Sequence, residues 1–436
     1  MNNYLNKLSL FINNSPSVFH VIDNIEKELK ENGFIELEEN KEFNLQKNTN
    51  YFISRNGSSI IAFKIGENVD KTDDISFNIS ASHSDSPTFK VKPNSSLSSQ
   101  LYSRLSVEGY GGMLCAPWFD RPLSVAGRVL VKDENKLSIR LVNINRDLLI
   151  IPSLAIHFNR NANSNATYNF ATDMQPLLSL NGEATIEEAI ARELNINKEN
   201  IISHDLFLYN RDLVRIWGYN NEFMSAPKLD DLECAYTTLQ GFLEGNNNNS
   251  INVYCCFDNE EVGSRTRQGA DSSFLFDTLR RIVFSLGGNE ETYNKALGTS
   301  FLVSADNAHA VHPNHPEVSD GLNKVYINKG IVIKFNASQS YTTDGISCGV
   351  FNEICSKVNV PTQLFTNRAD LRGGGTLGNI SCSHVSIMSV DIGLPQLAMH
   401  SSYETAGVED IEHMIKAMKE YYSTSIKINK EEIILE

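Results

Sequence analysis

The sequence predicts an α/β protein: a three-layer sandwich with a central, mostly parallel sheet, plus an inserted second domain that is mainly β. Beyond Met224, strand and helix candidates alternate, which is typical of a parallel sheet covered by helices. Between about Lys92 and Met224, short strand candidates alternate with turns instead. The length of 436 residues exceeds one ordinary hydrophobic core. We therefore expect one domain formed by residues 1–92 and 225–436, interrupted by an inserted domain of residues 93–224.

The first part of the chain predicts one helix and two strands. Apolar residues recur at helical spacing between residues 15 and 33, with a serine at the start and Gly33 at the end. Apolar runs predict strands at 59–65 and 75–82. The second strand runs into Ser-His-Ser-Asp-Ser-Pro, where Pro87 interrupts regular pairing.

The inserted domain and the part after it supply the remaining elements. In the insertion we expect a strand at 137–142, a helix at 187–194 and a loop at 110–122. After it, the helix candidates are 232–243, 272–286, 345–358 and 408–422. The strand candidates are 251–257, 300–304, 331–335 and 385–390.

Composition limits the possible functions. The net charge of −15 argues against binding to nucleic acid or to an anionic membrane. The seven cysteines lack the spacing of a disulfide framework, which indicates a reducing compartment. The sequence shows no signal-peptide pattern and no run long enough to span a membrane. We expect a soluble, cytoplasmic protein.

The predicted strand 251–257 ends in an acidic tip that contains Asp258, Glu260 and Glu261. Adjacent carboxylates repel each other unless a cation or a shared proton offsets the repulsion. One interpretation is a solvated acidic turn, which is the ordinary context of a Glu-Glu pair. The other gives one glutamate a metal to bind and the second a proton to move. The acidic tip by itself leaves both interpretations open. Asp258 is expected to be a surface or turn residue.

Histidines and carboxylates also follow the other predicted strands. Each has an ordinary explanation when taken singly; Asp231, for example, suits a helix N-cap. Because reactive groups of such sheets gather where the strands end, five clusters together predict one site. Nitrogen and oxygen ligands suit zinc or a related divalent ion, and two ions need a carboxylate that bridges them. The clusters are His83 with Asp85, Asp230 with Asp231, Glu260 with Glu261, Asp306 with His309 and His312, and His400.

Seven longer motifs resemble those of the aspartyl aminopeptidase family of dinuclear zinc exopeptidases. The similarity runs from about residue 15 to about residue 420. The motifs are SHSDSP (82–87), WFDRPLSVAGR (118–128), IPSLAIHFNR (151–160), KLDD (228–231), FDNEEVGS (257–264), SADNAHAVHP (304–313) and PQLAMH (395–400).

The resemblance implies a role for each candidate residue. Asp230 would bridge two zinc ions, which cobalt or manganese could replace. His83 and Asp306 would complete the ligands of one ion, and Glu261 and His400 those of the other. Glu260 matches the general base, and Asp85 would orient His83. Substrate would contact His309, Lys334 and Tyr341, together with His157 from a neighbouring subunit.

These roles predict a metal-dependent aminopeptidase that removes acidic (Asp or Glu) N-terminal residues from peptides. The resemblance also implies that the first domain is the catalytic metallopeptidase and that the insertion mediates dimerisation and oligomerisation. The expected assembly is a tetrahedral dodecamer, that is, twelve subunits built from dimers. Two alternatives are an aminopeptidase of neutral or broad specificity and a non-catalytic assembly protein of the same fold. For Lys334, the alternative is a strand lysine that reaches solvent.

Overall fold

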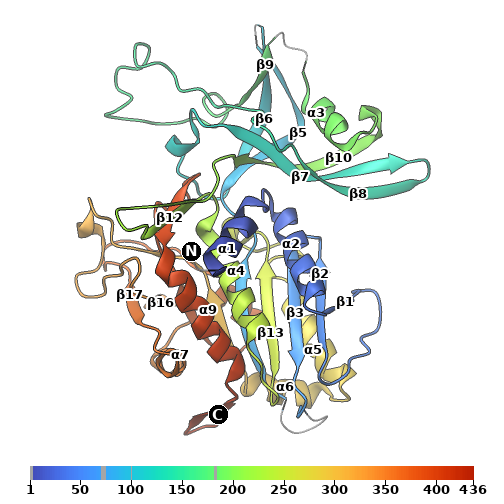
Figure 1. The fold of residues 1–436 in the computed structure, drawn as a ribbon, viewed down its shortest axis with the longest axis vertical. Helices are drawn as coiled ribbons and strands as arrows, with labels where there is room; N and C mark the ends of the chain where they lie inside the picture. The colour runs from blue at the N-terminus through green and yellow to red at the C-terminus, as the bar shows by residue number, and fades with distance from the viewer. Residues whose placement is uncertain (1–2, 70–74, 100, 181–183) are drawn as a thin grey trace.

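The computed structural model, shown in Figure 1, describes residues 3–69, 75–99, 101–180 and 184–436. The largest sheet in this part of the chain has nine strands. The four middle strands, β13, β4, β14 and β18, are parallel to one another. Antiparallel pairs join β3 to β13, β16 to β18 and β2 to β3, so the sheet is mixed around a parallel centre. This confirms the predicted α/β character. The strands, in spatial order, are β1 (Ile35–Leu37), β2 (Asn50–Arg55), β3 (Ser59–Ile65), β13 (Ile251–Phe257), β4 (Phe77–His83), β14 (Phe301–Ala305), β18 (Met388–Gly393), β16 (Ile331–Phe335) and β17 (Thr362–Thr366).

Helices cover both faces of this sheet. Successive side chains of a strand point to opposite faces, and in β13 Tyr254 and Cys256 belong to one hydrophobic cluster while Val253 and Cys255 belong to another. Burial on both sides explains why this strand is apolar throughout. The first cluster includes residues of α1 (Asn3–Asn13), α2 (Val18–Glu31), α4 (Leu229–Glu244), α7 (Gly345–Lys357) and α9 (Val408–Ser423); the second includes residues of α5 (Phe274–Ser285), α6 (Glu290–Gly298) and α8 (Leu377–His384).

Several element boundaries differ from the prediction. Helices α1, α6 and α8 were not expected, and the strand predicted at 385–390 begins at Met388 because α8 extends to His384. Helix α4 begins at Leu229, but Asp230 and Asp231 have non-helical φ and ψ. The Asp231 side chain does not cap this helix, because its Oδ2 accepts from the N–H of His83 and its Oδ1 has no hydrogen-bond partner among the described residues. The alternative of Asp231 as an N-cap is therefore wrong. The peptide bond between Asp230 and Asp231 is cis.

A second sheet of six strands, drawn above the first in Figure 1, is antiparallel at every neighbouring pair. It has its own hydrophobic cluster, which includes Ile186 and Ile190 of α3 (Ile186–Leu194). Thr185 and Glu188 form a capping box at the start of α3. The proposed domain limits fall inside β5 and β12 (Phe223–Ala226), and the division into domains stays a prediction. The strands are β8 (Lys136–Asn143), β7 (Leu123–Asp133), β10 (Ile201–Asn210), β5 (Thr88–Ser99), β6 (Tyr102–Tyr110) and β9 (Leu177–Leu180).

A third sheet of five short strands adjoins the end of the large sheet. It brings residues from before α4 next to residues that follow β18, because β12 pairs with β20 and β20 with β19. Its strands are β11 (Arg215–Trp217), β12, β20 (Glu404–Gly407), β19 (Pro395–Leu397) and β15 (Ala308–His309); the hairpin β21 (Ile426–Ile428) and β22 (Ile433–Leu435) is separate. In the described part of the chain, no helix has the length and apolarity required to cross a membrane.

Candidate metal centre

The structure brings the five predicted ligands together at one edge of the large sheet. His83 is the last residue of β4, and Asp306 directly follows β14. Asp230 lies in the first turn of α4, and Glu261 lies in the 3-10 turn Glu260–Val262 after β13. His400 follows β19. All five line one cavity of about 320 Å³.

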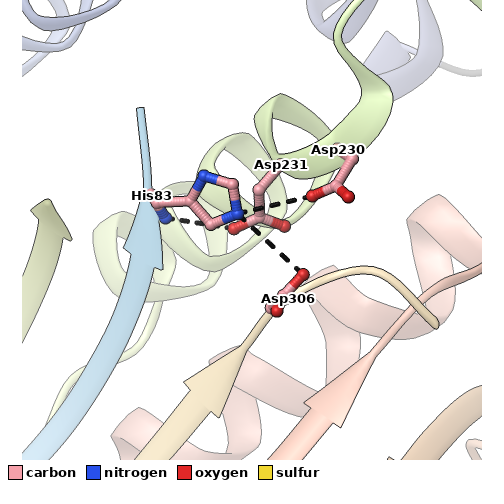
Figure 2. Close-up of side chains that lie close together, drawn as sticks. All are labelled: His83, Asp230, Asp231 and Asp306. Atoms are coloured by element: carbon pink, nitrogen blue, oxygen red, sulfur yellow. Dashed lines mark hydrogen bonds and ion pairs between the residues drawn. The ribbon is translucent and has the colours of Figure 1, made fainter. Parts of the chain in front are cut away.

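Asp230 lies between two histidines. Its Oδ1 is 3.4 Å from His83 Nε2, and its Oδ2 is 3.4 Å from His400 Nε2. Asp306 Oδ1 is 3.9 Å from His83 Nε2, and Glu261 Oε2 is 3.5 Å from His400 Nε2. Figure 2 shows the first group, in which Asp230 and Asp306 both face His83. The five side chains therefore form two groups that share one carboxylate.

These distances suit a cation between the ligand atoms. Two atoms that each bind a tetrahedral zinc ion at about 2.1 Å are roughly 3.4 Å apart. Among the described residues, none donates a hydrogen bond to the buried oxygens Asp230 Oδ1, Asp231 Oδ1 or Glu261 Oε1. Because a buried carboxylate oxygen without a partner is costly, this donor set fits divalent metal ions.

The ring nitrogens that face away from Asp230 fix the tautomer of both histidines. His83 Nδ1 is 3.1 Å from the backbone oxygen of Asp85, and His400 Nδ1 is 2.5 Å from that of Gly112. A carbonyl oxygen accepts hydrogen bonds only, so each Nδ1 carries the hydrogen. Each Nε2 is then free to bind a metal ion.

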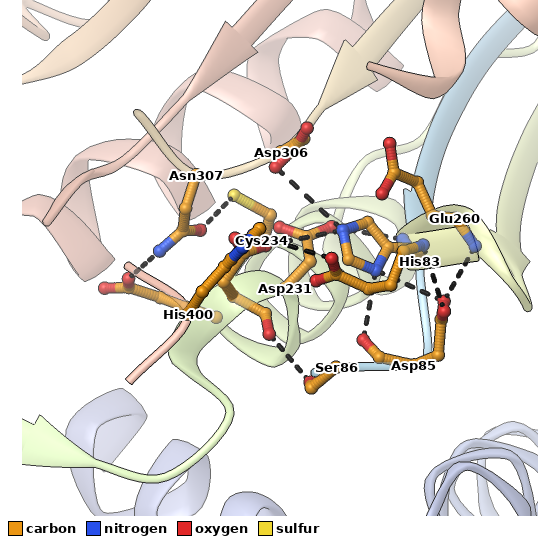
Figure 3. A network of polar contacts seen from close by, with 12 residues as sticks. His83, Asp85, Ser86, Asp231, Cys234, Glu260, Asp306, Asn307 and His400 are labelled. Carbon is orange, nitrogen blue, oxygen red and sulfur yellow. Dashed lines mark hydrogen bonds and ion pairs between the residues drawn. The ribbon is translucent and has the colours of Figure 1, made fainter. Parts of the chain in front are cut away.

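Asp85 holds the acidic tip in place as well as contacting His83. Its Oδ1 accepts a hydrogen bond from the backbone N–H of Glu260 at 3.1 Å, and its Oδ2 accepts one from that of Glu261 at 3.2 Å. The hydroxyl of Tyr110 donates to the same Oδ2 at 2.7 Å. Asp85 Oδ1 is 3.4 Å from His83 Nδ1 (Figure 3). Asp85 therefore positions three of the predicted site residues.

Burial perturbs the pKa values of the acidic groups. It raises the pKa of Glu260 to about 8 and holds that of Glu261 well above its ordinary value. Burial also acts to raise the pKa of Asp230, but His400 and His83 outweigh it and leave that pKa below its ordinary value. A carboxyl whose pKa lies near neutrality is suited to proton transfer, which distinguishes Glu260 from the central Asp230.

Of the two expectations for Asp258, the surface position is wrong, whereas the residue does lie in a bend directly after β13. Its side chain is buried, and burial raises its pKa to about 7. Its backbone N–H donates to Ser59 Oγ at 2.9 Å, and its Oδ1 accepts from the N–H of Asn259 at 2.7 Å. The chain around Gln268 covers this end of β13, because Ser59 Oγ also donates to the backbone oxygen of Gln268.

The predicted substrate residues His309, Lys334 and Tyr341 line the same cavity. Lys334 is 2% exposed, so the alternative of a lysine that reaches solvent is wrong. Its Nζ donates to the backbone oxygen of Asn307 at 2.8 Å and lies 3.6 Å from Asp306 Oδ2. Burial acts to lower the pKa of Lys334, but Asp306 and other anionic groups keep it above its ordinary value.

The predicted candidates Asp85, His157 and His312 do not line the cavity. Asp85 contacts the site residues from outside the cavity, whereas His312 is exposed. His157 lies on the long loop between β8 and β9, and its side chain is exposed. The neighbouring Phe158 is 81% exposed.

Sequence reasoning missed two buried carboxylates around the site, Asp391 and Glu404, and it considered a third, Asp231, only as a cluster member or helix N-cap. Asp231 Oδ2 accepts from the backbone N–H of His83 at 3.1 Å. Asp391 accepts from Thr342 N–H at 2.6 Å and from Thr376 Oγ1 at 2.5 Å, which joins two walls of the cavity. Glu404 contacts the backbone at Asp230 and His400. An acid inside an apolar strand, as in Ser-Val-Asp-Ile-Gly, was the signal available for Asp391.

Comparison with known proteins gives a consistent result. Residues 11–422 match the family model described as Aminopeptidase I zinc metalloprotease (M18). The chain is 47% identical over 428 residues to the probable M18 family aminopeptidase 2 of Clostridium novyi, covering 96% of this chain and 98% of that protein. It is 37% identical over 421 residues to the protein of the same description from Ectopseudomonas mendocina, covering 95% and 96%.

A solved structure, the S. cerevisiae mApe1 dodecamer, matches with a TM-score of 0.83 at 25% identity and covers 96% of both chains. The match to the family model spans nearly the whole chain and includes every residue of the candidate site. The chain therefore belongs to the M18 family of zinc metalloprotease aminopeptidases, the aspartyl aminopeptidase family that its motifs resemble.

Proposed function

We propose that this aminopeptidase uses two zinc ions to remove acidic residues from the N-termini of peptides. His83 and Asp306 would hold one ion, Glu261 and His400 would hold the other, and Asp230 would contribute one oxygen to each. The observation that carries the proposal is the placement of the two Asp230 oxygens, each 3.4 Å from a different histidine.

Zinc bound there supplies a Lewis acid that lowers the pKa of a water molecule and polarises the scissile carbonyl. Glu260 takes the proton of the attacking water and passes it to the leaving amine. Asp85 fixes the position of Glu260 through the backbone N–H at 3.1 Å. The carboxylates that line the cavity attract the free α-amino group of a peptide, which restricts cleavage to chain ends.

Chelation tests the proposal. Aspartyl, glutamyl, leucyl and lysyl chromogenic amides are assayed before chelation, after it, and after zinc, cobalt or manganese is restored. We expect activity to disappear with the metal and to return with about two ions per chain. Unchanged turnover after complete metal removal excludes the mechanism.

Lys334 supports the acidic preference. A lysine ammonium has three hydrogens. One donates to the backbone oxygen of Asn307, and a second faces Asp306. The third is left for the carboxylate of a substrate in the cavity, where burial strengthens the attraction.

We expect Lys334→Met to lower kcat/KM for the glutamyl amide by about 10- to 100-fold relative to the leucyl amide, since a hydrogen bond to a charged group contributes roughly 1.5–3 kcal/mol. Steady-state kinetics on both amides measure the ratio. Lys64→Met is a matched control, because the amine of Lys64 also donates to backbone carbonyls, those of Leu243 and Gly245, away from the cavity. An unchanged ratio in Lys334→Met favours an aminopeptidase of neutral or broad specificity.

The loop around His157 supports a homo-oligomer in which this residue reaches the active site of a neighbouring subunit. Leu154 is 65% exposed, Ile156 44% and Phe158 81%, and exposed apolar side chains in one loop mark an interaction surface. The similar mApe1 structure is a dodecamer. We propose the same assembly, built from dimers, for this chain. A cytoplasmic location agrees with its seven free cysteines.

Two variants of this loop separate assembly from chemistry. Phe158→Asp is expected to give a smaller species by light scattering and to lose activity with the assembly. His157→Ala is expected to keep the wild-type mass while kcat/KM falls by about 10-fold or more, because the contribution of the neighbouring subunit is lost. A fully active Phe158→Asp monomer contradicts the shared site.

A further inference from the structure

Glu404 contacts the backbone of two proposed zinc ligands at once. It is the first residue of β20 and is 1% exposed. Its Oε2 accepts a hydrogen bond from the N–H of Asp230 at 3.0 Å, and its Oε1 accepts one from the N–H of His400 at 2.7 Å. One carboxylate therefore joins the start of α4 to the loop that carries His400.

Both backbone segments need such an acceptor. Asp230 lies in the first turn of α4, where N–H groups have no partner within the helix. His400 has a φ of 66° and follows a bend in which Ala398 has a φ of 58°. The N–H of His400 therefore does not take part in the backbone hydrogen bonds of a β-sheet. A buried N–H requires a partner, and Glu404 supplies it in both places.

The contacts of Glu404 are selective for one of the two ligand groups. Asp230 and His400 belong to the group completed by Glu261. In the other group, the N–H of His83 donates to Asp231 and that of Asp306 donates to the backbone oxygen of Ile392 at 3.0 Å. Apart from the shared Asp230, Glu404 thus contacts only the group of His400 and Glu261, whereas Asp85 contacts a residue of each group.

We propose that Glu404 is a positioning residue that sets the affinity of the ion held by Asp230, Glu261 and His400. It touches neither the ion nor the substrate, and it acts by fixing the separation of Asp230 Oδ2 and His400 Nε2. This role rests on the proposed two-zinc function. It requires a carboxylate, because each oxygen accepts one N–H. A glutamine of the same shape has a single acceptor oxygen, and its NH₂ group would face the second N–H.

Glu404→Gln tests the proposal through metal binding. Apo protein is titrated with zinc against a chromophoric chelator of known affinity. We expect wild type to bind two ions, and the variant to bind one with unchanged affinity and the second about 10- to 100-fold more weakly, the range for loss of a group that supports a ligand. Excess zinc should restore turnover with the wild-type KM, which a general loss of structure would not allow.

Asp410→Asn is the matched control. Asp410 is also a buried carboxylate whose two oxygens accept backbone N–H groups, from Asn328 at 2.6 Å and Gly330 at 2.8 Å. It lies in α9 and does not line the cavity. We expect Asp410→Asn to lower the melting temperature while both zinc affinities stay at wild-type values.

The outcomes separate the two proposals. Two wild-type affinities in Glu404→Gln overturn the positioning role, as does an equal loss at both ions. A wild-type protein that binds fewer than two ions overturns the two-zinc function instead. If Glu404→Gln does not fold, Glu404→Asp replaces it: this residue keeps two acceptor oxygens but is too short to reach both N–H groups, so selective weakening of one ion supports the role and two intact affinities overturn it.

Discussion

Glu260→Gln is expected to lower kcat by roughly 10²- to 10⁴-fold, the usual contribution of a general base, while both zinc ions stay bound. Glutamine keeps the size of the side chain and removes its ability to take a proton. The backbone N–H that Asp85 accepts is untouched by the change. Steady-state kinetics on a glutamyl amide give kcat, and elemental analysis of the same preparation gives the ion content.

The ion content decides how a loss of activity is interpreted. A variant that loses metal together with activity shows that Glu260 is a structural or ligating residue, and the assignment as a base then fails. Asp258→Asn is the matched control at the same acidic tip. Asp258 is buried, and its Oδ1 accepts a hydrogen bond from the backbone N–H of Asn259, a role that the amide oxygen of asparagine can keep. We expect this control to keep near-wild-type kcat.

Asp230→Asn is expected to bring activity to the assay background and zinc content to one ion per chain or fewer. The aspartate offers one oxygen to each histidine side of the site, both at 3.4 Å. An asparagine offers one oxygen and one NH₂ group, so only one ligand group keeps its acceptor. The substitution also removes the negative charge of the carboxylate between the two ions, which weakens the binding of both ions.

Elemental analysis and zinc titration check this result, and circular dichroism confirms that the variant is folded. Retention of two ions with substantial turnover contradicts the bridging role. The comparison with Glu404→Gln is informative. Asp230→Asn should lower the affinity for both ions, whereas Glu404→Gln should lower the affinity for one. If Glu404→Gln weakened the binding of both ions as Asp230→Asn does, the selective role of Glu404 would be overturned.

The sequence predicted that the candidate clusters meet at one sheet edge because that part of the site follows from simple rules, whereas the choice of five ligands among them came from the family resemblance. Apolar runs gave the strands, and parallel strands end at one edge. Polar residues directly after those runs, such as His83, Asp306 and Glu261, then had to lie near one another. The acidic specificity and the residue roles came from the family resemblance, since spacing alone does not show what a cavity binds.

The residues that the sequence did not predict depend on long-range contacts. Glu404 is useful only because β20 pairs with β12, which places it beside Asp230, 174 positions away. Asp258 looked like part of a solvated tip, but the chain near Gln268 covers it. Lys334 follows the short apolar run 331–333, and a lysine at the end of such a run can either stay buried or reach solvent. In each case the surroundings come from another part of the fold, which local pattern does not show.

The loop that follows β6 has a consequence for how the protein matures. Gly112 accepts the hydrogen of His400 Nδ1, the N–H of Leu114 donates to the backbone oxygen of His400 at 3.0 Å, and Tyr110 donates to Asp85. These residues lie in the predicted insertion, so the ligand geometry is complete only after the insertion has docked. Zinc uptake by a newly made chain would therefore report that docking. A chain without residues 93–224 would lack the Gly112 oxygen that contacts His400 and the Tyr110 hydroxyl that contacts Asp85, so we expect it to bind zinc poorly.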